Sequence, residues 1–573
     1  AIPTWSFANS EANMWPSSYW SSINYCTATT PCRRACYLCP SSDFPSWDLF
    51  ASALGNSQCY FDPPPGAVII RPSAIAQWSA IKGDWNGSCF GFAATSLLYF
   101  DSLRNVAADF PGYGSVSAVP LTDDSRDLIN RLYLYQFGQN QQAHISAQTN
   151  SSNPTQTLLA CRSRFENGTV DDRVLMLFDN SSSGGHAVVP YRCSQDGGDP
   201  TTWYIYVRDS NFPGDNTRRI VVNTSTNTWS YSGLPGWGGS GRMFLMDAAE
   251  NYLGPLFLTD TAAASANIRY YFGETGSVKI ESPIGEIGHL GDVLYGNVPN
   301  AIPIIPANGQ NTRPLGYVLP SGHWYCEATG VTDGVFTVVD GNKRVFRHGG
   351  AKSGIISAAY VPIGVVGPGG TLTVYNNLTG PVRMLPESLY VQAISIEPDS
   401  EIVVEIGDFH VTAGDSLKVI LSDGSFVDVE NFGESTSYDL FIEIVNAQTD
   451  AVFYHPGIPI TGDGAHRVRP DWRSQGDSAV ILIDSDLDGQ FEDSVRVANL
   501  NEPLYRCGDA DASGAVTISD AVFLINYIFA GGPGPVVVMA GDADCSGLIT
   551  ISDAVYLINY IFAGGPAPCA ACP

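Results

Sequence analysis

The residues best suited to covalent chemistry are a cysteine and a histidine that lie far apart in the chain. Cys89 follows a glycine and a serine, and the apolar run after it predicts a helix over residues 89–106. His186 begins a predicted strand, and Asp209 and Asn211 follow a later one. A thiol at a helix N-terminus ionises readily, because the first turn carries partial positive charge and free N–H groups. This order predicts a nucleophile, a general base and an orienting group.

The order resembles that of papain-like cysteine peptidases, including bacterial branches that use an aspartate as the third residue. The resemblance covers residues 66–248 and rests on short motifs. It implies that Cys89 attacks a peptide carbonyl and that His186 first accepts the thiol proton and later protonates the leaving amine. It also implies that Asp209 orients the imidazole, with Asn211 as the alternative.

The chain departs from that family in the residue expected to stabilise the oxyanion. The family usually has a glutamine about six residues before the cysteine, and Gly83 stands there. The Cys89 backbone N–H can supply one donor, and Asn86 or Gln77 a second. Two other interpretations stay open: an inherited fold that has lost catalysis, and an unrelated domain with a buried cysteine and a core histidine.

The clearest internal repeat lies near the C-terminus, where residues 508–514 recur as 541–547 with a period of 33 residues. Each copy has oxygen-bearing residues at loop positions 1, 3, 5, 7, 9 and 12 and a glycine at position 6, which is the pattern of a calcium loop. Position 12 holds Asp where the standard EF-hand has Glu. The expected ligands are Asp509, Asp511, Ser513, the Ala515 carbonyl, Thr517 and Asp520, and then Asp542, Asp544, Ser546, the Leu548 carbonyl, Thr550 and Asp553.

Each of these loops runs into an apolar helix, and the pair resembles the type I dockerin module of bacterial extracellular assemblies. The resemblance implies a calcium-folded domain that binds a cohesin-like domain on another protein. In that family loop positions 10 and 11 help to choose the partner, and here they hold Ile518, Ser519, Ile551 and Ser552. Binding to another copy of this chain, or a calcium-stabilised terminal domain without a partner, are the alternatives.

A third acidic loop precedes this repeat. Asp484, Asp486 and Asp488 alternate before a glycine, and Asp493 follows. This pattern predicts another calcium site, although Val495 at position 12 shows that the loop is not an EF-hand. A polar β-turn without an ion is the alternative.

Composition narrows the class of protein. The net charge of −28 over 573 residues argues against nucleic-acid binding and suits a soluble extracellular protein. No apolar run of about 18 residues occurs, so we expect no membrane span. Thirteen cysteines indicate an oxidising compartment; if Cys89 stays free, twelve remain, enough for six disulfides. A removed export signal would explain why the chain starts at Ala1, and we expect a secreted or cell-surface location.

Periodicity and composition predict a multidomain chain: an α+β domain, then all-β sandwich modules, then a small α-helical domain with paired calcium loops. The resemblances described above imply that the first of these is papain-like and the last dockerin-like. In the α+β domain we expect helices at 74–81 and 123–135 and strands at 174–178, 186–191, 203–208, 217–222 and 243–246. The expected parts are a Cys-rich segment (1–65), the papain-like domain (66–248), one β-sandwich module (249–367), a second with the acidic loop (368–500) and the dockerin-like domain (501–573).

Two functions of different classes follow. The first is a secreted cysteine peptidase, acting on a peptide or protein substrate and tethered to an extracellular assembly by its calcium module. The second is a non-catalytic structural or adhesive protein, such as a surface-layer or fibre subunit, that uses a degenerate papain-like fold as a scaffold. The geometry around Cys89 is the feature that distinguishes them.

Overall fold

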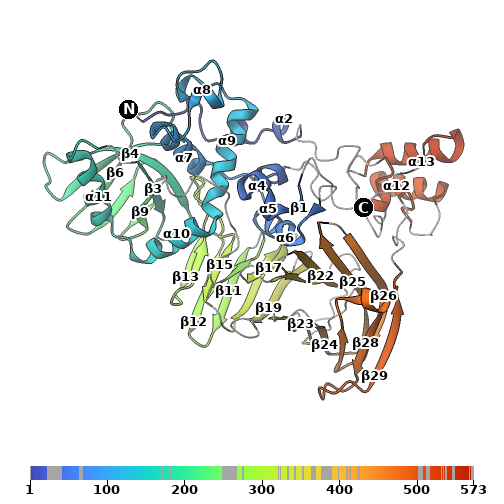
Figure 1. Cartoon of the computed structure of the whole chain (residues 1–573). Coiled ribbons are helices and arrows are strands. Elements are labelled where there is room, and N and C mark those ends of the chain that lie inside the picture. The colour runs from blue at the N-terminus through green and yellow to red at the C-terminus, as the bar shows by residue number, and fades with distance from the viewer. Residues whose placement is uncertain are drawn as a thin grey trace.

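The computed structural model shows a multidomain, β-rich chain (Figure 1). It describes residues 2–21, 42–63, 69–247, 267–362, 370–375, 390–500, 507–530, 532, 535, 538–544 and 549–568, except 170–171, 181, 274–275, 321, 323, 332–333, 341–343, 352–353, 398, 408, 410, 412–413, 423–425, 448–449, 512–515 and 567.

The N-terminal region is built on two long helices that pack against each other, α7 and α9. Helix α7 is buried along nearly its whole length, as its apolar sequence requires. Helix α9 begins with a capping box in which the Thr122 and Ser125 side chains satisfy each other's backbone N–H groups. The helices are α1 (Glu11–Met14), α2 (Ser17–Trp20), α4 (Trp47–Leu54), α5 (Asn56–Cys59), α6 (Pro72–Ile81), α7 (Cys89–Phe100), α8 (Val106–Asp109), α9 (Asp123–Leu134), α10 (Gln139–Ser151) and α11 (Pro154–Glu166).

A seven-stranded antiparallel sheet lies beside these helices, in the order β8-β7-β6-β5-β4-β3-β9. Side chains alternate across it: Val174 and Met176 join the core that contains α7, whereas Leu175 and Leu177 join a second core with α11. The sheet therefore holds helices on both faces, with α7 against β3 and β4. Its strands are β3 (Arg173–Phe178), β4 (Gly185–Gln195), β5 (Thr202–Arg208), β6 (Arg219–Asn223), β7 (Thr228–Tyr231), β8 (Gly238–Gly239) and β9 (Met243–Asp247). A separate pair, β1 (Tyr60–Asp62) and β2 (Ile69–Ile70), lies earlier in the chain.

Two large antiparallel sheets follow, and both contribute to one hydrophobic core. The nine-stranded sheet has the order β14-β15-β10-β17-β18-β21-β22-β25-β26, and the eleven-stranded sheet β13-β12-β11-β16-β19-β20-β23-β24-β27-β28-β29. Strands β10–β19 are Asn267–Tyr271, Ser277–Ser282, Gly285–Leu290, Val293–Gly296, Ile302–Ile304, Gly316–Pro320, Trp324–Val331, Gly334–Asp340, Arg344–Ala351 and Gly354–Pro362. Strands β20–β29 are Gly370–Tyr375, Tyr390–Ile396, Ser400–Gly407, Ser416–Ser422, Phe426–Phe432, Thr436–Asn446, Asp450–Ile460, Gly464–Val468, Ser478–Asp484 and Asp493–Ala498.

The nine-stranded sheet also packs against the N-terminal region. Helix α6 contacts β17, β18, β21 and β22, and Figure 1 shows α4, α5 and α6 over this end of the sheet. The buried Glu401 side chain accepts hydrogen bonds from the Ser73 backbone N–H and hydroxyl, both at 2.7 Å, and pairs with Arg71 at 3.4 Å. A buried carboxylate with this many donors fixes the register between the two parts.

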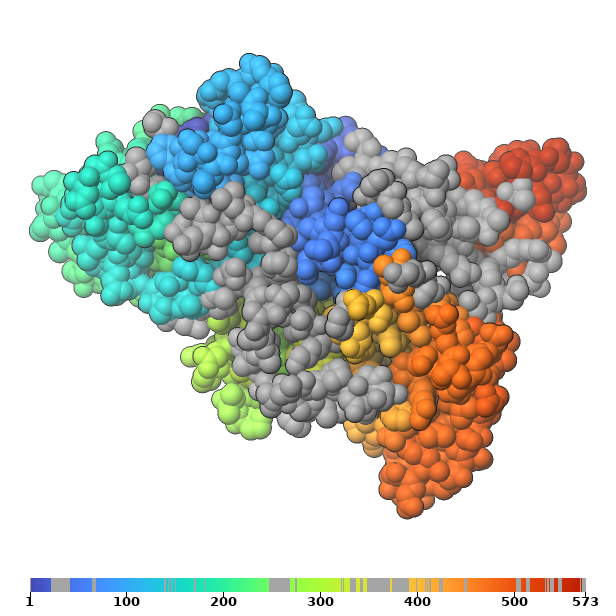
Figure 2. Space-filling view, in the orientation of Figure 1, coloured from blue at the N-terminus to red at the C-terminus, as the bar shows by residue number. Residues whose placement is uncertain are grey.

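The C-terminal helices α12 (Ile518–Ala530) and α13 (Ile551–Ala563) pack against each other over a small core of their own. The two copies have the same local structure: the Thr517 N–H donates to Asp520 Oδ2 and the Thr550 N–H to Asp553 Oδ2, each at 2.7 Å. In Figure 2 these helices form a lobe at one end of the molecule.

The expected β-rich, multidomain organisation is confirmed, with several local differences. Helix α7 ends at Phe100, not near residue 106, because the polar residues from Asp101 onward end the apolar face. Strand β18 pairs with β21, and β19 with β20, across the expected boundary between residues 367 and 368, and that boundary stays a prediction. No helix in the described part of the chain has the length and apolar character needed to cross a membrane.

The expected disulfides are not seen where the structure describes the cysteines. Cys59 and Cys326 have free, buried thiols. Cys161 and Cys193 contribute to the same hydrophobic cluster. Cys26, Cys32, Cys36, Cys39, Cys545, Cys569 and Cys572 lie outside the described residues.

Candidate functional site

Cys89 lies at the first turn of α7, as the sequence predicts. Its sulfur accepts a hydrogen bond from the Ala187 backbone N–H at 3.3 Å, and its thiol donates to the Ala307 carbonyl oxygen at 3.1 Å. The residue before it is held firmly: Ser88 accepts from Trp85 Nε1 and donates to Asn130 Oδ1. These contacts fix the start of the helix and hold the thiol against the first residues of β4.

His186 and Asp209 form a buried pair beside Cys89. His186 Nε2 donates to Asp209 Oδ1 at 3.0 Å, and both side chains are fully buried. The other imidazole nitrogen, Nδ1, is buried without a hydrogen-bond partner among the described residues. One nitrogen is thus held by a carboxylate, and the second is left for a reacting group, as a base in a cysteine site requires.

The charges around His186 favour its protonated form. Burial alone would lower the pKa of His186, but the Asp209 carboxylate and then Cys89 outweigh burial and raise that pKa to about 10. Burial opposes ionisation of Asp209, yet the imidazolium and two hydrogen-bond donors bring the pKa of Asp209 below its usual value. The pair is therefore an imidazolium and a carboxylate at neutral pH, and Cys89 is close enough to contribute to its electrostatics.

Two residues support Asp209, and only one of them was expected. The Asn211 backbone N–H donates to Asp209 Oδ1 at 2.8 Å, so Asn211 assists the orienting carboxylate and does not replace it. The Tyr231 hydroxyl donates to Asp209 Oδ2, and its ring stacks on His186 with a centroid distance of 6.5 Å. Nothing in the local sequence identifies Tyr231, since it comes from β7, two strands away from β5.

The two side chains expected to stabilise the oxyanion have other contacts. The Asn86 side chain is engaged with the Asp84 carbonyl oxygen at 3.0 Å, and Gln77 lies on α6, which packs on the nine-stranded sheet. Asn9, which the sequence did not indicate, is closer to the site: its side chain accepts from the Ser88 N–H at 2.7 Å and donates to Asn211 Oδ1 at 3.0 Å. Its amide is a donor adjacent to the nucleophile, of the kind an oxyanion hole requires.

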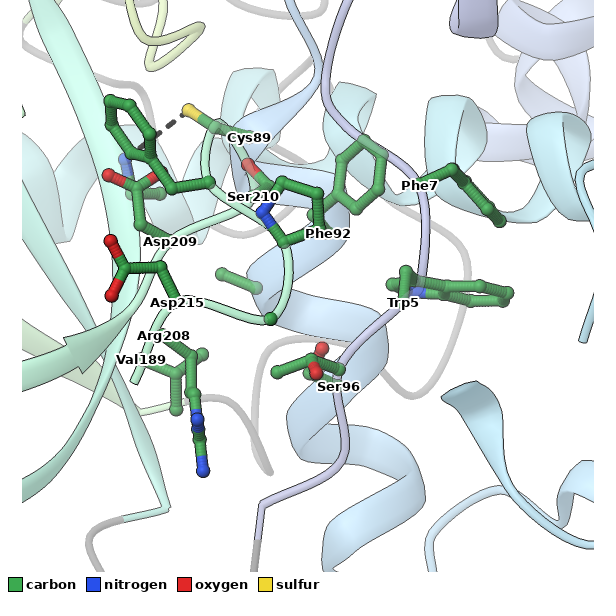
Figure 3. A pocket seen from close by; sticks show the side chains of 16 residues that line it. Trp5, Phe7, Cys89, Phe92, Ser96, Val189, Arg208, Asp209, Ser210 and Asp215 are labelled. Atoms are coloured by element: carbon green, nitrogen blue, oxygen red, sulfur yellow. Dashed lines mark hydrogen bonds between the residues drawn. The ribbon is translucent and has the colours of Figure 1, made fainter. Parts of the chain in front are cut away.

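Two different surfaces enclose the thiol. On one side is a pocket of about 30 Å³ lined by Trp5, Phe7 and Phe92, which Figure 3 shows together with Cys89 and Asp209. This volume is about that of one water molecule, too small for a substrate. On the other side lies the segment of residues 305–311 between β14 and β15, which we call the covering loop. Cys89 has no solvent exposure.

The repeated loops at the C-terminus bring carboxylates together as expected. Oxygen atoms of Asp509, Asp511 and Asp520 lie within 4.8 Å of one another, and so do those of Asp542, Asp544 and Asp553. Three carboxylates at this spacing suit a divalent cation with oxygen ligands, and would repel one another without it. Thr517 and Thr550 lie beside these clusters; Ser513, Ala515, Ser546 and Leu548 lie outside the described residues.

The third acidic loop gathers a set of carboxylates that differs from the expected one. Asp484, Asp486 and Asp488 cluster within 4.8 Å as expected, but the fourth member is Glu492. Asp493 instead accepts a hydrogen bond from the Ser494 N–H and begins β29. The loop turns back on itself, and the Glu492 carboxylate accepts a hydrogen bond from the Ser485 N–H at 3.1 Å, which holds it beside the cluster.

Comparison with known proteins adds no relative to this geometry. No protein-family model, no curated protein and no solved structure matches the chain.

Proposed function

We propose that this chain is a cysteine-dependent peptidase, or a related acyl-transfer enzyme, of the papain-like kind. The observation that carries the proposal is the buried His186–Asp209 pair, in which Nδ1 of His186 has no hydrogen-bond partner among the described residues and lies near the thiol of Cys89. A structural histidine in a core usually has both ring nitrogens satisfied or is neutral. His186 is charged, is oriented by Asp209, and has Nδ1 left for a reacting group.

The roles follow from these positions. In the reactive form the proton of the Cys89 thiol lies on Nδ1 of His186, so that His186 is the imidazolium and Cys89 the thiolate. The thiolate then attacks the carbonyl carbon of a peptide. The Asn9 amide, with the N–H groups of the first turn of α7, lies where the oxyanion forms. Imidazolium returns the proton to the leaving amine as the C–N bond breaks, and water then hydrolyses the thioester to release the carboxylic acid and restore the thiol. Asp209 keeps the imidazole oriented throughout.

The test is labelling by an epoxysuccinyl peptide, which alkylates activated thiols, followed by location of the modified residue by mass spectrometry. We expect labelling at Cys89, no label there in Cys89→Ala, and a loss of about 100-fold or more in labelling rate for His186→Ala. Cys326→Ala, which removes a different buried thiol, is the matched control and should label normally. Failure to label Cys89 even when the covering loop is displaced would overturn the proposal.

We propose further that the C-terminal region binds calcium and attaches the chain to another protein in an extracellular setting. The supporting observation is a set of exposed apolar residues at equivalent positions of the two repeats. Phe529 and Phe562 are each 69% exposed, although both are large aromatic residues. The equivalent pairs are Ile518 and Ile551, Val522 and Val555, Tyr527 and Tyr560, and Phe529 and Phe562. A cohesin-like domain is the partner implied by the dockerin resemblance, with a second copy of this chain as the alternative.

The non-catalytic alternative, a structural or adhesive extracellular protein, is favoured by one observation: the Cys89 thiol has no solvent exposure. It predicts calcium-dependent self-assembly, seen by light scattering, and no peptide hydrolysis under any condition. Hydrolysis that depends on Cys89 would exclude it.

A further inference from the structure

The covering loop occupies the space next to Cys89 that a substrate would need. The Ala307 carbonyl oxygen accepts the thiol hydrogen, and Ala307 itself is fully buried. The Ala307 N–H donates to Gln136 Oε1 at 2.6 Å. The N–H and the carbonyl group of Ala307 are thus both hydrogen-bonded to the site, and the partner of the carbonyl is the candidate nucleophile, Cys89.

The next two residues are bound in a similar way. The N–H groups of Asn308 and Gly309 donate to the Gly185 carbonyl oxygen at 3.0 and 2.8 Å, immediately before His186. The Asn308 carbonyl oxygen accepts from Asn9 Nδ2 at 3.3 Å, the amide assigned above to the oxyanion. These are main-chain contacts, which do not depend on the loop's side chains and would serve any peptide placed there.

Glycines make this close approach possible. A Cβ on Gly87 would lie 1.9 Å from the Asn308 carbonyl oxygen, and one on Gly185 would lie 2.6 Å from the Pro306 carbonyl oxygen. A Cβ on Gly309 would lie 3.0 Å from Nδ1 of His186, so the loop backbone covers the unpartnered nitrogen. Two of these glycines belong to the site and one to the loop, and each leaves room for the opposite backbone.

A groove begins on the far side of the covering loop. Its volume is about 550 Å³, in the range of ligand-binding sites, and it is lined by Asp84 and Asn86 on the approach to Cys89. Pro306 and Asn308 line it as well, whereas Ala307 between them contacts the thiol. One short stretch of chain thus separates the groove from the nucleophile.

We propose that residues 305–311 are a built-in occupant of the peptide-binding site, and that the protein is self-inhibited until this loop moves. When the loop leaves, the groove and Cys89 form one continuous site for a peptide. Gln136, the Gly185 carbonyl and Asn9 are then the groups that bind the peptide backbone. The inference rests on the proposed function for its substrate class, but the closure of the site can be measured without any catalysis.

The experiment measures the rate at which iodoacetamide alkylates Cys89 in the full-length protein, with the site located by mass spectrometry. Ala307→Asp places a charge where the side chain is fully buried and should expel the loop. Gln310→Asp adds the same charge to an exposed position of the same loop and is the matched control. We expect Ala307→Asp to accelerate alkylation of Cys89 by about 100-fold, because native protein reacts only when the loop opens, and Gln310→Asp to leave the rate unchanged.

Unfolding would also expose Cys89, and two other thiols report it. Cys59 and Cys326 are free and buried in other parts of the chain. Both should stay protected in Ala307→Asp. A milder variant, Gln136→Ala, removes one hydrogen bond to the loop and should give a smaller acceleration that is again confined to Cys89.

The proposal is overturned if native Cys89 reacts as fast as an unhindered thiol, or if both variants fold and neither accelerates alkylation. If the loop variants expose Cys89 yet no peptide is cleaved, the inhibitory loop stands and the peptidase assignment fails. If native protein already cleaves peptides as well as Ala307→Asp does, the peptidase assignment stands and self-inhibition fails.

Discussion

At the scale of single residues, the charged His186–Asp209 pair is the feature that needs a physical explanation. Two buried charges are costly unless hydrogen bonds satisfy them. Asp209 receives three donors, from His186, Tyr231 and the Asn211 N–H, so its carboxylate is well satisfied. Among the described residues the imidazole has one hydrogen-bond partner, and its Nδ1 is left unsatisfied. This asymmetry is a cost in stability that a purely structural pair would avoid, and it is the strongest argument at this scale for a chemical role.

The pair predicts a definite dependence of stability on pH. The folded pKa of His186 is raised to about 10, above its unfolded value of about 6.5, so its contribution is complete below pH 6.5 and is lost as pH rises towards 10. The pKa of Asp209 is lowered, so its contribution is present above about pH 4 and is lost as pH falls further. The pair should therefore stabilise the fold most between about pH 4 and 6.5.

This dependence can be measured by scanning calorimetry of native protein and Asp209→Asn from pH 5 to 10 at constant calcium. The difference in melting temperature should be several degrees at pH 6 and shrink steadily towards pH 10. Asp196→Asn, which removes a partly buried carboxylate that accepts from Tyr204, serves as the control. A difference that stays flat across the range would show that His186 is not charged in the folded protein.

At the scale of elements, the two repeated acidic loops and the helices that follow them act as one unit. Each Asp at position 12 lies in the first turn of its helix, where it accepts from the N–H groups of its loop: Asp520 from Asp511 and Thr517, Asp553 from Asp544 and Thr550. A cation bound there would therefore link each loop to its helix. Among the described residues, the fully buried core between the two helices is a small set of alanines and leucines, and the isoleucines and aromatic residues around it are only partly buried. Binding energy should therefore be a large part of the stability of this pair.

We expect removal of calcium by EGTA to unfold this pair of helices selectively. Calcium at 100 times its dissociation constant should contribute about 3 kcal/mol to their stability. Asp520→Asn should remove most of the calcium-dependent rise in the melting temperature of this region, measured by calorimetry with and without calcium. Asp493→Asn, at a carboxylate outside the third cluster, should have no such effect. An EGTA-treated protein with an unchanged thermal profile would contradict the calcium assignment.

The parts of the fold that follow from local pattern were predicted well. The apolar run after Cys89 forms α7, and the strand at 174–178 is β3 within one residue. Carboxylates at alternating loop positions also come together as predicted, because their spacing is local. Tyr231, Asn9 and Ala307 were not found, because they reach the site from 22 to 218 residues away in the chain. The periodicity of apolar residues within a helix or strand says nothing about contacts between residues so far apart in the chain. Such contacts arise only when the elements pack in the tertiary fold.

At the scale of the whole molecule, the nine-stranded sheet is part of the candidate enzyme and not a separate spacer. It supplies the covering loop through β14 and β15, and it packs on α6. Ile304, Val339 and Val403 from this sheet belong to the same buried core as α7. Regulation of Cys89 by a loop from this sheet is a consequence of that shared core, since a loosely tethered module would move relative to the thiol and could not keep a backbone carbonyl hydrogen-bonded to it.

This arrangement predicts that the N-terminal region does not survive excision at the boundary suggested by the sequence. A fragment of residues 1–248 loses the sheet that covers α6 and leaves Glu401's donors, Ser73 and Arg71, without their acceptor. Exposing such a surface should make the fragment aggregate, or melt at least 10 °C below the corresponding transition of the full chain.

A fragment of residues 1–500 keeps the sheet and should retain that transition and the slow alkylation of Cys89. The measurement is calorimetry and iodoacetamide kinetics on both fragments. A soluble 1–248 fragment with native stability would show that the two parts are independent domains. If Cys89 in that stable fragment were alkylated rapidly, the covering loop alone would be what protects the thiol in the full chain.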